Sequence, residues 1–419
     1  SSTTTDVSVY DRLVWPEGEL ESLLVSGERR RELLAYFGPD EYAALVPLAR
    51  AAAAADFDSS RIVYLVPGIM GSQLGAARPP PLPADLLWID PVDFQHGGLL
   101  RLALEADVGG DADIEACGPV VYNHLRLKLA LAAEGFVVRT FAYDWRRGVL
   151  ELGRRLAARL AADGSPRCAI VGHSMGGLVA RAALLHAGER IDRIVTVGTP
   201  HAGSFATLQA LRGVHGTVRR LAQLDPRHTA EALATRVFAG FPSLYDLLPR
   251  ASRVDWFDAS SWPTAGPQPR HAELARAATL ELPRDPERIA CIVGCGEATV
   301  TDAEHVDAQL RYHFTRAGDG TVPLASALLE GHATHYVPLL HGELPRDARV
   351  ARAVCDLLSS GTTSALPHHP PRLGTGDLVL DEQSMREQYN DKLDWQHLAP
   401  EQRHAWLDGL NAPARLALA

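Results

Sequence analysis

The chain has 419 residues, 46% of them hydrophobic, which is enough to bury a sizeable core. Its formal net charge of −10 and the lack of a lysine- and arginine-rich stripe argue against a nucleic-acid partner. The five scattered cysteines do not make a disulfide framework, and we expect neither a metal nor a cofactor.

No apolar run approaches the ~20 residues needed to cross a bilayer, and no signal-peptide pattern starts the chain. With a native chain start, the sequence favours a cytoplasmic location. If a signal peptide was removed before residue 1, the protein would be secreted. The sequence makes no prediction of the oligomeric state.

The first 60 residues have a helical pattern without motifs that suggest chemistry. Leucines recur at helical spacing, as at Leu20, Leu23 and Leu24, and an alanine run of high helix propensity follows near residue 51. We therefore predict a helical N-terminal extension over residues 1–60.

Between residues 61 and 360, short apolar runs alternate with helical patterns. The runs cover residues 61–68, 136–145, 168–172, 193–198, 288–294 and 335–340. Continuous apolar strands that alternate with helices are typical of a parallel sheet covered on both faces. The predicted fold class is therefore α/β, with a mostly parallel, doubly wound sheet.

Two stretches interrupt this alternation, and a third follows it. Residues 75–119 hold a proline run and several glycines, and residues 205–285 are proline-studded without a clear strand. We expect the first to be lid-like and the second to form a cap over the site. Residues 361–419 are predicted to be a polar C-terminal tail.

The strongest motif is VGHSMGG (171–177), which places Ser174 in a Gly-x-Ser-x-Gly sequence between an apolar strand and an amphipathic helix. This context is typical of a strained strand-to-helix turn that exposes a nucleophilic serine. The turn also puts the Met175 N–H at a helix N-terminus, where it favours an oxyanion. A glycine-rich turn with a bystander serine is the alternative, and His173 is interpreted as a packing residue.

An acid and a base are expected after the serine, at the ends of late strands. Asp319 lies in AGDGTVP (317–323), and His341 directly follows the last predicted strand. His341 would be the general base and Asp319 its orienting partner. A turn-forming role for Asp319 and a surface-loop role for His341 are the alternatives. Competing candidates are His332 and His335 for the base, and Asp302 and Asp307 for the acid.

The loop VPGIMGSQL (66–74) follows the first core strand and is expected to supply the second oxyanion donor through the N–H groups of Ile69 and Met70. Ile69 and Trp88 are further predicted to contact substrate. His201 either lines the rim of the site or has a structural role. Asp144 is interpreted as part of an ion-pair network.

These pieces together resemble the lecithin:cholesterol acyltransferase-like family of α/β-hydrolases. The matching segments follow the family's order and are VPGIMGSQL (66–74), LLWID (86–90), AYDWRR (142–147), GHSMGG (172–177), GTPHAGS (198–204), AGDGTVP (317–323) and HGELP (341–345). The resemblance implies an α/β-hydrolase fold with a catalytic triad of Ser174, Asp319 and His341. It also implies oxyanion N–H groups from Met70 and Met175, and a lid or membrane-facing segment around Trp88.

The predicted function is a serine esterase or lipase that works through an acyl-enzyme, with acyl transfer as a variant. Its partner would be an ester with an apolar acyl part, and residues 75–119 are the candidate contact with a lipid surface. Alternatives are a polyester depolymerase or lactone hydrolase, a thioesterase or amidase with the same triad, and a catalytically silent binding module.

Overall fold

The computed structural model describes residues 16–263, 268–411, 416 and 418. Its centre is a six-stranded sheet in the order β11-β8-β7-β6-β1-β5, and every neighbouring pair is parallel. The strands are β1 (Ile62–Val66), β5 (Val137–Thr140), β6 (Cys168–His173), β7 (Ile191–Val197), β8 (Ile289–Gly294) and β11 (Ala333–Val337). The parallel sheet predicted from the apolar runs is therefore confirmed, with a strand in each of the six runs.

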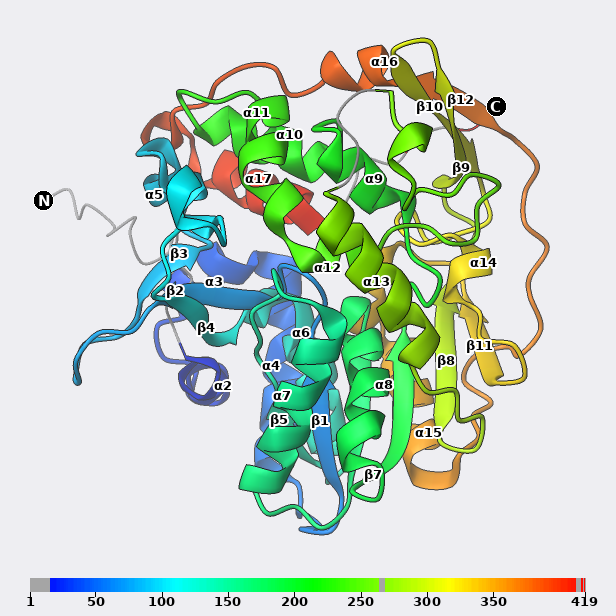
Figure 1. The fold of residues 1–419 in the computed structure, drawn as a ribbon. Coiled ribbons are helices and arrows are strands. Elements are labelled where there is room, and N and C mark those ends of the chain that lie inside the picture. The colour runs from blue at the N-terminus through cyan, green and yellow to red at the C-terminus, as the bar shows by residue number, and fades with distance from the viewer. Residues whose placement is uncertain (1–15, 264–267, 412–415, 417, 419) are drawn as a thin grey trace, which may run out of the picture.

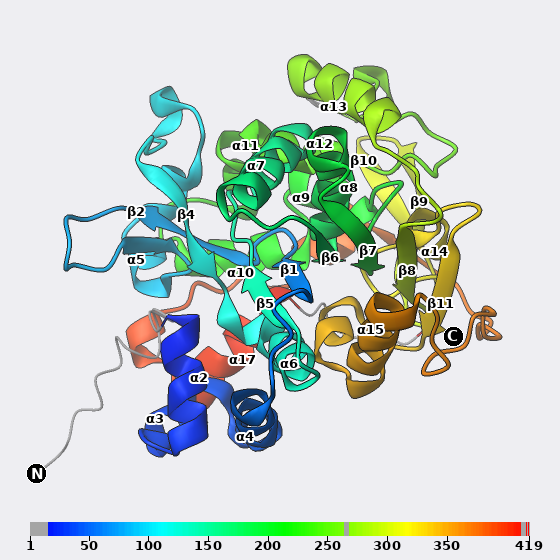
Figure 2. The ribbon, with the colours of Figure 1, turned by 90° about the horizontal axis from the view of Figure 1, so that it is seen from below.

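Helices cover both faces of this sheet, as Figure 2 shows. The helices on one face are α7 (Val149–Ala162) and α8 (Met175–Ala187), and those on the other are α6 (Val121–Ala133) and α15 (Ala348–Ser360). Alternate strand residues serve the two faces: Tyr64 packs into one buried cluster and Val63 into the other. A strand buried on both faces is apolar throughout, which is why these runs were recognisable.

The close contact between α7 and α8 depends on a missing side chain. Gly153 of α7 faces α8, and a Cβ at this position would lie 2.4 Å from the Ala182 Cβ. A methyl group there would force the helices apart, and α8 is the helix that follows the predicted nucleophile.

The N-terminal segment consists of α2 (Glu17–Ser26), α3 (Arg30–Phe37) and α4 (Pro39–Ala54). These helices agree with the expected helical extension, of which residues 1–15 lie outside the described residues. Buried Glu41 of α4 accepts hydrogen bonds from Arg126 on α6 and Arg346 beyond β11. The segment is therefore attached to the core by partly buried charge pairs.

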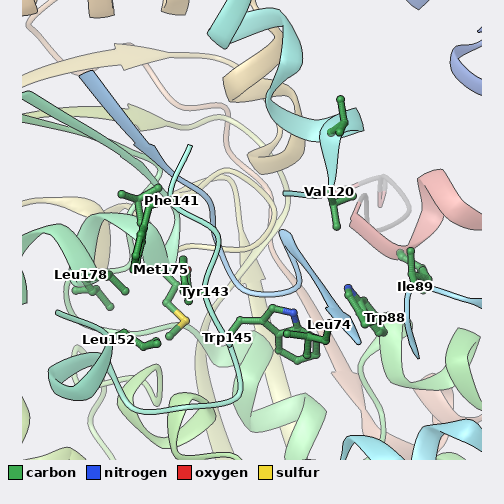
Figure 3. Close-up of a cluster of buried hydrophobic side chains, with 14 of the residues drawn as sticks. Leu74, Trp88, Ile89, Val120, Phe141, Tyr143, Trp145, Leu152, Met175 and Leu178 are labelled. Atoms are coloured by element: carbon green, nitrogen blue, oxygen red, sulfur yellow. The ribbon is translucent and has the colours of Figure 1, made fainter. Parts of the chain in front are cut away.

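The predicted lid-like stretch forms most of a second, antiparallel sheet in the order β3-β2-β4, with α5 (Pro91–Gln95) between β3 and β4 in the chain. Its strands are β2 (Ser72–Ala76), β3 (Asp85–Trp88) and β4 (Ile114–Pro119). Leu74, Trp88 and Trp145 belong to one buried cluster here, with the Trp88 and Trp145 rings in edge contact at 5.1 Å (Figure 3). This packing fixes the small sheet beside the carboxyl ends of β1 and β5.

Short helices lie over the carboxyl ends of the central strands (Figure 1). They are α9 (Phe205–Leu211), α10 (Gly216–Leu224), α11 (Ala230–Arg236), α12 (Pro242–Asp246) and α13 (Pro269–Glu281). They occupy the predicted cap, of which residues 264–267 lie outside the described residues. No strand is assigned to the described residues of this stretch, as its sequence suggested.

The C-terminal segment differs from the predicted polar tail in that it rejoins the body. Its strand β12 (Leu378–Asp381) pairs with β10 (Gln309–Thr315), which itself pairs with β9 (Thr299–Val306). After α16 (Glu382–Arg386), α17 (Pro400–Asn411) lies beside α10. Trp395 and Trp406 are buried against each other, with ring centroids 5.4 Å apart. These two indoles explain the docking: they bury large apolar surfaces that a free tail would expose.

Among the described residues, the helices are too short or too polar for any of them to cross a membrane.

Candidate active site

Ser174 occupies a strained turn between β6 and α8. Its backbone has φ 53° and ψ −129°, which a residue with a Cβ rarely adopts. The Ser174 N–H donates to the Val197 carbonyl at 2.8 Å, and the Ser174 carbonyl accepts from the Thr199 hydroxyl at 2.8 Å. Neighbouring β7 and the loop after it therefore hold the turn from both sides.

The glycines on either side of the serine are required because neighbouring backbone atoms leave no room for a Cβ. A Cβ on Gly172 would lie 2.5 Å from the Gly177 nitrogen, and one on Gly176 would lie 2.1 Å from the Val66 carbonyl oxygen. Both contacts are with backbone, so neither can be relieved by a rotamer change. The Gly-x-Ser-x-Gly spacing thus lets α8 start directly beside the end of β1.

The structure brings Ser174, His341 and Asp319 together, as the sequence predicted. His341 Nε2 lies 2.9 Å from Ser174 Oγ, and His341 Nδ1 lies 2.7 Å from Asp319 Oδ2. All three residues are less than a tenth exposed. The second carboxylate oxygen of Asp319 accepts the N–H groups of Thr321 at 3.0 Å and Val322 at 2.7 Å. These bonds hold the carboxylate plane, so that Oδ2 points at the imidazole.

His173 supports the base from the side, in accordance with its interpretation as a packing residue. Its ring lies 5.0 Å from the His341 ring, and its Nε2 lies 3.2 Å from the His341 carbonyl oxygen. Burial, and secondarily the nearby His341, hold the pKa of His173 well below its usual range. A neutral His173 donates its Nε2–H to that carbonyl and adds no charge beside the base.

The loop after β1 passes directly over the serine. A Cβ on Gly68 would lie 2.9 Å from the Ser174 Cβ, so only glycine allows this approach. Met70 has φ 62°, and its carbonyl accepts the Trp88 indole N–H at 3.0 Å. Among the described residues, no backbone carbonyl outside the helices and strands accepts the N–H of Met70. The indole therefore fixes the orientation of the Met70 carbonyl.

Ser174 and His341 line a cavity of about 170 Å³. Its walls come from the loop after β1, α6, the cap helices and α17, and are mainly apolar: Ile69, Met70, Trp88, Trp145, Ala206, Ala210, Val218, Leu221, Phe238, Phe241, Leu244, Pro345 and Leu410. A cavity of this kind favours a ligand with an apolar part next to the serine. Predicted contact residues Ile69 and Trp88 both lie in its wall.

His201 is not among the residues that line this cavity. The side chain is buried behind the loop after β7, where Nδ1 lies 3.2 Å from the Arg181 guanidinium and Nε2 lies 3.3 Å from the Thr196 hydroxyl. Burial holds the pKa of His201 well below its usual range. The structural alternative given for this residue therefore fits its position.

The competing candidates lie elsewhere. His335 is buried, with Nδ1 3.4 Å from the Leu366 carbonyl, and Asp302 pairs with Arg253. Among the described residues, no group of His, Cys, Asp and Glu side chains is placed to hold a metal ion.

Asp144 lies in a buried ion-pair network rather than at the nucleophile. Arg146 binds its carboxylate at 2.8 Å through both Nε and Nη2, and donates to the carbonyls of Leu102 and Ile114. One guanidinium thus joins the turn after β5 to the small antiparallel sheet. The interpretation as a loop-anchoring ion pair agrees with this geometry.

Several cavity residues were not predicted, among them His124 of α6, His215 before α10, Phe241 of the cap and Leu410 of α17. Each lies in a helix or loop far from Ser174 in sequence. Their local patterns are ordinary, so only the tertiary fold reveals that they surround the serine.

This chain is similar to one family model and to several solved structures. Residues 150–278 match the family model described as the alpha/beta hydrolase fold. Solved structures of similar fold include Bacillus licheniformis lipase BlEst2 in its propeptide form, at 16% identity and TM-score 0.40, over 76% of this chain and 54% of that one. This chain thus spans about half the length of that propeptide form.

The mature form of the same lipase aligns at 14% identity and TM-score 0.39, over 74% of this chain and 95% of that one. Bacillus subtilis carboxylesterase CesB aligns at 11% identity and TM-score 0.33, over 73% and 86%. With its parallel six-stranded sheet, covering helices and family match, the chain has the α/β-hydrolase fold.

Proposed function

We propose that this protein is a serine hydrolase that cleaves carboxylic esters through an acyl-enzyme on Ser174. The observation that carries the proposal is the continuous hydrogen-bonded series from Ser174 Oγ through His341 to Asp319, at the wall of an apolar cavity. A serine needs such a base to become nucleophilic, and the base needs its orienting carboxylate.

In the first step, His341 Nε2 takes the Ser174 hydroxyl proton as Oγ attacks the ester carbonyl carbon. Asp319 accepts the Nδ1–H, which fixes the tautomer that leaves Nε2 free and stabilises the imidazolium that forms. As the tetrahedral intermediate collapses, the C–O bond to the alcohol breaks and His341 returns the proton to the leaving oxygen.

The carbonyl oxygen becomes negatively charged in this intermediate. We assign its stabilisation to the N–H groups of Met70 and Met175. Met175 is the first residue of α8, where the helix dipole adds positive potential, and Met70 lies in the loop that crosses the serine. Losing one such donor typically costs about 10²–10³ in rate.

Water completes the cycle by attacking the acyl-enzyme, with His341 again as the base. An alcohol that reaches the acyl-enzyme before water would receive the acyl group instead. The resemblance of seven sequence segments to the lecithin:cholesterol acyltransferase-like family supports ester substrates over amides. The apolar walls support an apolar acyl part.

The test compares Ser174→Ala with the wild type on p-nitrophenyl hexanoate, and labels both with a fluorophosphonate probe. We expect turnover to fall by about 10⁴-fold or more and labelling to disappear. Ser22→Ala, at an exposed site on α2, carries the same substitution far from the cavity and should behave as wild type. Retention of most activity in Ser174→Ala would contradict the proposal.

A further inference from the structure

The cavity beside Ser174 holds a polar residue that the acyl-transfer chemistry does not use. His124 lies on α6 and is 4% exposed, and neither of its ring nitrogens has a hydrogen-bond partner among the described residues. Other buried polar atoms also lack partners, but of those that line the Ser174 cavity, only the two nitrogens of His124 are in this state in the described part of the chain.

Filling apolar space with an imidazole that has no hydrogen-bond partner is energetically unfavourable. Burying a polar group without a hydrogen bond is unfavourable, and a phenylalanine or leucine would fill the same place without this cost. Native structures leave few such groups unpaired, and each of them calls for an explanation, such as a catalytic role or a bound water, ion or ligand. The position of His124 in the cavity wall points to a ligand.

The His124 ring is connected to His341 through the ring of His173. The His124 ring packs edge-on against His173 at 5.5 Å, and His173 packs against His341 at 5.0 Å. His124 is therefore two ring contacts away from the base. It borders the same cavity as Ser174, where it can meet a substrate group away from the ester carbonyl.

The chemistry of the ring defines the group it would bind. Burial lowers the pKa of His124 to about 4, so the imidazole is neutral near pH 7 and presents one N–H donor and one lone-pair acceptor. A hydroxyl group has the same pair of functions and no charge. A carboxylate or phosphate would instead call for a cation.

We propose that His124 is a specificity residue that hydrogen-bonds a hydroxyl group of the substrate, so that the preferred esters carry a hydroxyl on the acyl chain or on the alcohol. The inference rests on the proposed esterase function and narrows it to hydroxylated esters. Hexanoate is a suitable acyl chain, because the cavity of about 170 Å³ is close in volume to cavities of about 150 Å³ that hold a six-carbon ring.

The experiment measures kcat/KM for three pairs of esters that differ by one hydroxyl. The acyl pairs are p-nitrophenyl hexanoate against its 3-hydroxy and 6-hydroxy derivatives, and the alcohol pair is ethyl hexanoate against 2-hydroxyethyl hexanoate. We expect the wild type to prefer the hydroxylated ester in at least one pair by about 5- to 150-fold, which corresponds to the cost of an unsatisfied buried group. The pair that shows it assigns the hydroxyl to the acyl or to the alcohol side.

His124→Phe keeps the ring against His173 but removes both nitrogens, and is expected to bring that ratio to about one. His335→Phe removes another buried histidine, which lies outside the cavity and whose Nδ1 is 3.4 Å from the Leu366 carbonyl. This control should keep the wild-type ratio. Fluorophosphonate labelling of Ser174 checks that each variant is folded.

A wild type that hydrolyses hexanoate esters without preferring a hydroxyl in any pair would overturn the inference and leave the proposed function intact. So would a folded His124→Phe that keeps the preference. The wild-type ratios decide the matter even if the variant does not fold. Absence of Ser174-dependent turnover of every ester would overturn both.

Discussion

His341 is bonded twice to Asp319: its backbone N–H donates to the Asp319 carbonyl at 2.8 Å, and its Nδ1 lies 2.7 Å from the Asp319 carboxylate. The backbone bond ties the loop after β11 to the loop that carries the acid. The side-chain bond therefore depends little on the mobility of either loop. Pre-positioning of this kind is what general-base catalysis requires.

Replacing Asp319 with Asn should stop catalysis while keeping the fold. The amide oxygen can still accept the N–H groups of Thr321 and Val322, and the backbone bond to His341 is untouched. The amide NH₂ would then face Nδ1 and force the tautomer that protonates Nε2. We expect kcat to fall by about 10⁴-fold with a nearly unchanged melting temperature. An active Asp319→Asn would remove Asp319 from the proposed mechanism.

Gly176→Ala should disrupt the turn at Ser174 through a steric clash. The added methyl would lie 2.1 Å from the Val66 carbonyl oxygen, so β1 and α8 must separate, at a cost of about 1–3 kcal/mol or more. The measurement is urea unfolding together with ester turnover, and both should fall. The matched control is Gly18→Ala in exposed α2, where nothing lies within 4 Å and stability should rise by up to about 1 kcal/mol.

Ala210→Leu should shorten the accepted acyl chain. Ala210 of α9 lines the cavity, and three extra carbons there would occupy space that an acyl chain uses. We expect kcat/KM for p-nitrophenyl octanoate to fall about 10- to 200-fold relative to the acetate ester, since this is the discrimination that a methylene-sized change gives. Ala161→Leu, at an exposed position of α7, should leave the ratio unchanged. An unchanged ratio in Ala210→Leu would place the acyl chain elsewhere.

Asp246 should make stability depend on pH. Its carboxylate accepts the Val149 N–H at 2.7 Å and so satisfies a free donor at the start of α7. Burial raises the pKa of Asp246 from 3.8 to about 6, against the opposing effect of this bond. The folded state thus holds the proton more tightly than the unfolded state. The tighter binding of this proton contributes about 3 kcal/mol to the free energy of unfolding. The contribution is fully present below pH 3.8 and is lost as pH rises through 6.

Asp246→Asn keeps an acceptor for the Val149 N–H but cannot ionise. In urea unfolding we therefore expect it to match the wild type near pH 4 and to exceed it at pH 8 by up to about 3 kcal/mol. Neighbouring Arg250 donates to backbone carbonyls, so these bonds survive the substitution. Asp246→Ala also loses the acceptor for the Val149 N–H. Its free energy of unfolding should therefore be about 1 kcal/mol lower than that of Asp246→Asn at both pH values. If Asp246→Asn were less stable than the wild type at pH 8, ionisation of Asp246 would not be the cause of the pH dependence.

The central sheet could be predicted from sequence because its strands are buried on both faces and read as unbroken apolar runs. Hairpin β9–β10 and strand β12 could not. Strand β10 alternates between buried and more exposed positions, β9 mixes charged and apolar residues, and β12 has no buried residue. A half-buried antiparallel strand gives a weaker signal than a fully buried parallel one.

The candidate site likewise contains residues that could be predicted from the sequence and residues that could not. Ser174 has a local signature, because the strained turn demands glycines at fixed spacing. Asp319 and His341 could be proposed from chain order and strand ends. His124 and Leu410 could not, because an ordinary helical residue becomes part of a cavity only through contacts distant in sequence. For His201 the sequence left two interpretations open, because its motif follows a strand end; in the structure the side chain lies against Arg181.

The docking of α17 has a consequence for the order in which the protein becomes functional. Leu410 closes one side of the cavity, and β12 completes the hairpin sheet, yet both are translated long after Ser174, His341 and Asp319. A nascent chain can assemble its central sheet and the turn that carries Ser174 while residues 378–411 are still inside the ribosome. The pocket next to the serine would then stay open to water until residue 410 has left the ribosome.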